Sequence, residues 1–127
     1  MKILVCEDQE SIRHMIETLV SASGHEVTAV ENGPKAVESA LSEPFDILLL
    51  DLMLPGSLDG FGVCERLRAD PKTRDLPIFI ISAADDAESR ARATAAGATA
   101  FYAKPFSPLA LLRTVERVLE GPARPAP

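Results

Sequence analysis

Three acids, a serine and a lysine each come at the end of a short apolar run in this sequence. Glu7 and Asp8 follow "KILVC", Asp51 follows "ILLL", Ser82 follows "IFII" and Lys104 follows "FYA". An isolated charged carboxylate at the end of a buried strand is unfavourable unless it is paired or takes up a proton. Alone, Asp8 or Ser82 is better explained as a helix cap, and Lys104 as a solvated side chain. Together, the five residues predict a binding or reaction site at the ends of the strands.

The chemistry that such a set can perform is phosphoryl transfer. Two carboxylates about 4 Å apart repel each other by roughly 4 kcal/mol at an effective dielectric constant of about 20, so converging acids need a cation or a proton. The available ligands are oxygens, which suit Mg²⁺ rather than zinc or copper. Ser82 and Lys104 add a hydroxyl donor and a positive charge for a phosphoryl group. A carboxylate can itself be the nucleophile and form an aspartyl-phosphate.

The elements that must position these residues alternate along the chain. Strand-like apolar runs are each followed by a segment with apolar residues at helical spacing. The runs around the first, third and fourth strands are continuously apolar, which is typical of a parallel sheet covered on both faces. The sequence therefore predicts a doubly wound α/β fold, in which ligands bind at the carboxyl ends of the strands. The runs are 2–6, 25–30, 45–50, 76–82 and 98–103, and the helical segments are 11–24, 32–43, 59–70, 86–97 and 107–120.

Length and composition exclude several classes of protein. A chain of 127 residues suits one domain with one substantial core. The net charge of −6 argues against a surface that binds nucleic acid directly. The N-terminal segment has neither a signal peptide nor a membrane span, so we expect a cytoplasmic protein that does not enter membranes. Cys6 and Cys64 are expected to be reduced thiols in or near the core.

The sequence resembles the receiver domain of the two-component response-regulator family, in particular single-domain chemotaxis-type regulators. The resemblance rests on "CEDQE", "LLLDLMLPGSLDG", "IFIISA" and "FYAKPFS", which stand in the family's order and spacing. It implies a flavodoxin-like (βα)5 sandwich with a five-stranded parallel sheet in the order 2-1-3-4-5. The receiver domain would cover residues 1–120, and the Pro-rich residues 121–127 would form a tail or the start of a linker.

The resemblance implies that Asp51 is the phosphoacceptor. The donor would be the phosphohistidine of a sensor histidine kinase or a histidine phosphotransfer protein. The cofactor would be Mg²⁺, bound by Asp8, Asp51 and the backbone carbonyl of Met53. Glu7 would act nearby or through water, and it stands where the family frequently has Asp.

The resemblance also implies how the domain changes state. Ser82 and Lys104 would bind the phosphoryl group, and Pro105 would follow a cis peptide bond. Phe101 occupies the switch-aromatic position, here without the hydroxyl of a tyrosine. The fourth helix, fifth strand and fifth helix would form the switching face, read by a downstream protein target or a fused output domain.

Two departures from the family pattern bear on the partners. The loop "LPGSLDG" is one residue longer than the commonest form. The segment 98–100 is "ATA", without the acids that form ion pairs in regulators that dimerise through this strand. We therefore expect a monomer or a weak dimer.

Two alternatives remain open. The chain could be the receiver fragment of a larger regulator whose output domain is missing. It could also be an Asp-nucleophile phosphatase of the haloacid-dehalogenase type, but that family needs a second Asp where this chain has Met53. We therefore expect a domain that accepts phosphate on its own Asp51 and dephosphorylates itself, rather than an enzyme. His14 is expected at the surface, and Tyr102 is expected to pack on the face opposite Phe101.

Overall fold

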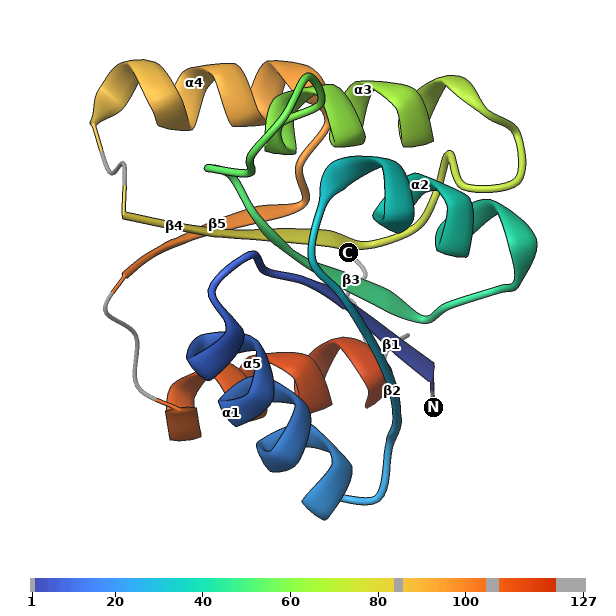
Figure 1. Ribbon diagram of the computed structural model, residues 1–127, viewed down its shortest axis with the longest axis vertical. Helices are drawn as coiled ribbons and strands as arrows, with labels where there is room; N and C mark the ends of the chain where they lie inside the picture. The colour runs from blue at the N-terminus through green and yellow to red at the C-terminus, as the bar shows by residue number, and fades with distance from the viewer. Residues whose placement is uncertain (1, 84–85, 105–107, 121–127) are drawn as a thin grey trace.

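The computed structural model describes residues 2–83, 86–104 and 108–120. In this part of the chain, five strands alternate with five helices along the sequence (Figure 1). The strands are β1 (Lys2–Cys6), β2 (Glu26–Val30), β3 (Ile47–Asp51), β4 (Ile78–Ser82) and β5 (Ala100–Ala103). The helices are α1 (Glu10–Ala22), α2 (Gly33–Ser42), α3 (Gly60–Ala69), α4 (Ala87–Ala96) and α5 (Pro108–Glu120).

All five strands form one parallel sheet in the order β2-β1-β3-β4-β5. Helices α1 and α5 cover one face, and α2, α3 and α4 cover the other (Figure 1). The predicted doubly wound, flavodoxin-like fold is therefore confirmed, including its strand order. Because the strands are parallel, their carboxyl ends meet at one edge of the sheet. The predicted Pro105 cis peptide and the expected tail at 121–127 lie outside the described residues.

The sheet divides the core into two apolar clusters. In the central strands, successive side chains point to opposite faces, so Leu48 and Leu50 pack toward α2 and α3 while Ile47 and Leu49 pack toward α1 and α5. The same alternation places Phe101 against the first cluster and Tyr102 against the second, as expected. The Tyr102 ring lies 5.8 Å from the Phe79 ring, between centroids.

Side-chain caps begin three of the helices that follow the strands. Asn32, Asp59 and Asp86 each accept a hydrogen bond from a backbone N–H three residues later, at 2.9, 3.0 and 3.2 Å. Helix α1 differs slightly from the predicted 11–24, since it begins at Glu10 and ends at Ala22. These caps define where α2, α3 and α4 begin after the carboxyl ends of the strands.

Helix α4 buries only small side chains against the rest of the fold. Its buried residues are Ala93 and Ala96. Two arginines on its exposed side reach neighbouring rings: the Arg90 guanidinium lies 4.7 Å from the centroid of Phe101, and that of Arg92 lies 3.9 Å from the centroid of Phe61. Cation–π contacts of this kind contribute about 0.5–1 kcal/mol at exposed sites. Part of the attachment of α4 therefore depends on these contacts.

Candidate functional site

The end of β1 supplies two carboxylates with different environments. Glu7 is 2% exposed, and its Oε2 accepts a hydrogen bond from the Gln9 backbone N–H at 3.1 Å. The next residue, Asp8, is exposed. Since Glu7 is almost fully buried, its charge needs a partner inside the site.

Asp51 is the last residue of β3 and lies beside β1 in the sheet. Its side chain is 5% exposed, and Oδ1 accepts a hydrogen bond from the backbone N–H of Met53 at 3.1 Å. Gly60 allows the start of α3 to pack against this strand end, because a Cβ there would lie 2.6 Å from the Cα of Leu52 and 2.8 Å from the carbonyl oxygen of Asp51. The start of α3 therefore packs directly on the backbone of Asp51 and Leu52.

Lys104 joins the two buried carboxylates. Its Nζ lies 2.9 Å from Oε1 of Glu7 and 3.3 Å from Oδ2 of Asp51. Its backbone N–H donates to the carbonyl oxygen of Ser82 at 2.8 Å, which continues the pairing of β5 with β4. Ser82 is fully buried at the end of β4. The predicted acids, the lysine and the serine therefore end neighbouring strands at one edge of the sheet.

The charges of this cluster perturb one another. Burial, followed by the negative charge of Glu7, raises the pKa of Asp51 from 3.8 to about 7, although Lys104 acts in the opposite direction. Burial of Lys104 favours its neutral form, but the hydrogen bond to Glu7 and the charges of both carboxylates raise its pKa overall. The protein alone thus carries more negative charge here than Lys104 neutralises.

A divalent cation fits this excess of negative charge. Glu7, Asp8 and Asp51 each offer a carboxylate oxygen, and these atoms lie within 4.8 Å of one another. An all-oxygen donor set containing three acids suits a hard cation such as Mg²⁺. The predicted carboxylate ligands are therefore brought together. Met53, whose backbone carbonyl was also predicted as a ligand, has a 62% exposed side chain beside the site.

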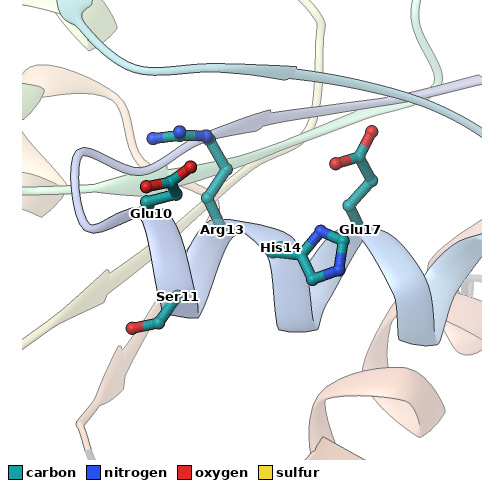
Figure 2. A pocket seen from close by; sticks show the side chains of 5 residues that line it. All are labelled: Glu10, Ser11, Arg13, His14 and Glu17. Carbon is teal, nitrogen blue, oxygen red and sulfur yellow. The ribbon is translucent and has the colours of Figure 1, made fainter.

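A hollow of about 550 Å³ lies over the exposed face of α1. It is lined by Glu10, Ser11, Arg13, His14 and Glu17, which Figure 2 shows projecting from successive turns of this helix. His14 is exposed, as predicted. The Arg13 guanidinium also reaches the loop after β1, where Nη1 donates to the carbonyl oxygens of Glu7 and Asp8 at 3.0 and 3.4 Å. The sequence pattern gave no signal of this contact, because Arg13 reads as an ordinary charged position of an amphipathic helix.

The remaining predictions about side chains also have outcomes. Phe101, at the predicted switch position, is half-buried beneath Arg90. Arg90 and Arg92 are exposed, and both also contact aromatic rings. Cys6 and Cys64 are buried and free, as expected, and burial raises the pKa of each thiol to about 12.

Comparison with known proteins identifies the family. Residues 3–116 match the family model described as the response regulator receiver domain. The chain belongs to the response regulator receiver family. The "Probable transcriptional regulator ycf27" of Porphyridium aerugineum is 39% identical to this receiver domain over 118 residues, which cover 93% of this chain and 48% of that protein. The receiver domain thus spans about half the length of that relative.

Solved structures agree with this assignment. The chemotaxis protein CheY4 of Vibrio cholerae is 31% identical, with a TM-score of 0.86 and coverage of 92% of this chain and 97% of that one. The receiver domain of a sensor histidine kinase from Pseudomonas aeruginosa PAO1 is 34% identical, with a TM-score of 0.84 and coverage of 91% and 94%. That second structure is described as having a magnesium ion coordinated in its active site cleft. Because the chain belongs to the receiver family, the alternative assignment as a phosphatase of the haloacid-dehalogenase type is no longer needed.

None of the helices in the described part of this receiver domain has the length and apolarity needed to cross a bilayer.

Proposed function

We propose that this receiver domain accepts a phosphoryl group on Asp51 from a phosphohistidine of a sensor histidine kinase or a histidine phosphotransfer protein. An Asp51 oxygen would attack phosphorus while the P–N bond breaks, and its electron pair would return to the imidazole ring. The observation that carries the proposal is the contact of Lys104 Nζ with both Glu7 and Asp51, at 2.9 and 3.3 Å, beside a third carboxylate. A group so placed can bind the oxygens of a phosphoryl group formed on Asp51.

Mg²⁺ is the proposed cofactor, held by Asp8, Asp51 and the backbone carbonyl of Met53, with Glu7 nearby. When bound, the ion would neutralise negative charge that develops on the phosphoryl oxygens. Each of the protein's own groups has a separate task. Asp51 supplies the nucleophile, Lys104 a fixed cation, and Ser82 a hydroxyl that can donate to the product.

The proposed output is a change in the face formed by α4, β5 and α5. Ser82 ends β4 and Phe101 lies on the neighbouring strand β5. An inward move of the Ser82 hydroxyl would therefore change the space available to the Phe101 ring. The ring is half-buried on the side of α4, a helix that buries little of its own surface. A downstream protein or a fused output domain would read this face.

We extend the proposal to residues 1–120 as one receiver module, monomeric or weakly dimeric, with 121–127 as a tail or linker. Two buried free thiols in the described chain support a reducing compartment such as the cytoplasm. We also propose that the domain accepts the phosphoryl group on itself and removes it by self-dephosphorylation, without acting on another substrate.

Labelling with a small phosphodonor tests the acceptor. Incubation with acetyl phosphate and Mg²⁺ should add one acid- and heat-labile phosphoryl group, detected by intact-mass spectrometry. Asp51→Asn should abolish the adduct because an amide is not a nucleophile here. The matched control is Asp75→Asn, which removes an exposed carboxylate and should be labelled like the wild type. Labelling of Asp51→Asn at the wild-type rate would place the acceptor elsewhere.

A further inference from the structure

Arg13 contacts the site from outside its ring of carboxylates. The guanidinium is half-buried on α1, and Nη1 donates to the carbonyl oxygens of Glu7 and Asp8 at 3.0 and 3.4 Å. Lys104, by contrast, contacts the carboxylate oxygens of Glu7 and Asp51. The two cations therefore act on different groups, since Lys104 occupies ligand oxygens and Arg13 leaves them available.

These two carbonyls lie in the peptide planes on either side of the Asp8 Cα. A peptide unit is planar, so a hydrogen bond to its carbonyl oxygen restricts the orientation of the whole plane. Restricting both planes narrows the backbone dihedrals of Asp8 and the direction of its Cα–Cβ bond. Asp8 needs such support because its side chain is exposed, whereas Glu7 and Asp51 are held by burial and by Lys104.

We infer that Arg13 is the positioning residue of the metal site: it clamps the loop after β1 so that the Asp8 carboxylate points toward Glu7 and Asp51. The inference rests on the proposed binding of Mg²⁺. Arginine suits this task because its guanidinium stays protonated at any working pH and offers fixed donors on a long stem. Arg13 also lines the hollow over α1 (Figure 2), so a partner that occupies the hollow would contact the clamp itself.

A purely electrostatic role predicts the opposite effect on metal affinity. A guanidinium near the site repels a divalent cation, so removal of its charge alone would tighten Mg²⁺ binding. If positioning dominates, removal weakens binding. Groups that orient metal ligands without touching the metal typically change affinity by about 10–100-fold.

The test compares Arg13→Met with the wild type. Methionine keeps an unbranched apolar stem and a high helix propensity, so α1 should form normally. Isothermal titration calorimetry with MgCl₂ should give a Kd at least about tenfold weaker in the variant. In the metal-free protein, hydrogen exchange at the amides of residues 8–10 should be faster. Arg66→Met, at an exposed position of α3, is the matched control and should change neither quantity.

Equal or tighter Mg²⁺ binding by Arg13→Met would overturn the inference, as would unchanged exchange at residues 8–10. If the wild type is labelled on Asp51 and binds Mg²⁺, and Arg13→Met has the same Kd and the same exchange, then Arg13 has no positioning role. The proposed function would still stand. A wild type that binds no Mg²⁺ would remove both.

Discussion

Asp51→Asn should stabilise the metal-free domain, and the gain should depend on pH. The pKa of Asp51 rises from 3.8 to about 7 on folding, because the carboxylate is buried beside Glu7. At about 1.4 kcal/mol per pKa unit, ionised Asp51 destabilises the folded state by at most about 4 kcal/mol. Asparagine has nearly the same shape and no charge to desolvate. The variant should therefore be more stable than the wild type above pH 7.

The sign follows from proton binding. Between pH 3.8 and 7 the unfolded chain has released the Asp51 proton while the folded chain retains it, so the wild type loses stability as pH rises. Below pH 3.8 both states are protonated and the penalty is absent. The advantage of Asp51→Asn should grow by about 1.4 kcal/mol per pH unit from pH 5 to 7 and then level off.

Urea denaturation in EDTA at pH 5, 6, 7 and 8 measures this difference. Asp75→Asn controls for the loss of one negative charge at an exposed position. Addition of Mg²⁺ at pH 8 should stabilise the wild type more than Asp51→Asn, because the ion relieves the same repulsion. A difference that does not vary between pH 5 and 8, or a less stable Asp51→Asn at pH 8, would refute the reasoning.

Three further substitutions test separate parts of the site. Mg²⁺ at a hundredfold excess over Kd should stabilise the folded wild type by about 2.7 kcal/mol and so raise its melting temperature. Asp8→Ala should remove most of this rise. A wild-type melting temperature that does not change with Mg²⁺ would contradict the proposed metal site. Ser82→Ala should still accept a phosphoryl group from acetyl phosphate, but its hydrogen exchange over residues 86–104 should no longer change when beryllofluoride binds. In Phe101→Tyr this change should remain. If the wild type shows no change either, the domain relays phosphate without switching its conformation. Gly60→Ala should lower the free energy of unfolding in urea by about 1–3 kcal/mol, because its methyl group meets backbone at 2.6 Å, and unchanged stability would show that α3 can shift.

Much of the fold could be predicted because each strand and helix carries its own local signal. The run from Ile47 to Leu50 is apolar at every position and is buried on both faces of the sheet. The placement of Asp51 then followed from the rule that parallel strands present their carboxyl ends at one edge. The strand order came from the family resemblance, since alternation of strands and helices does not specify it.

Contacts between elements were harder to predict. Met15 has the helical spacing of a core residue, yet it is 38% exposed. The stacking of Arg90 on Phe101 joins a helix to a strand, and the hydrogen bonds of Arg13 join a helix to the preceding loop. Such contacts depend on side-chain reach in the folded chain. Neither a charge pattern nor a periodicity encodes them.

The two apolar clusters on opposite faces of the sheet have a consequence for how this domain can evolve. Energetic effects of substitutions usually add when residues are well separated and share no partners, and the helix residues of one cluster lie across the sheet from those of the other. The buried positions of α1 and α5 can therefore accumulate sequence changes with little epistasis toward those of α2, α3 and α4. The two surfaces could then diversify at different rates, and a new partner could be acquired on one side while the response on the other is inherited unchanged.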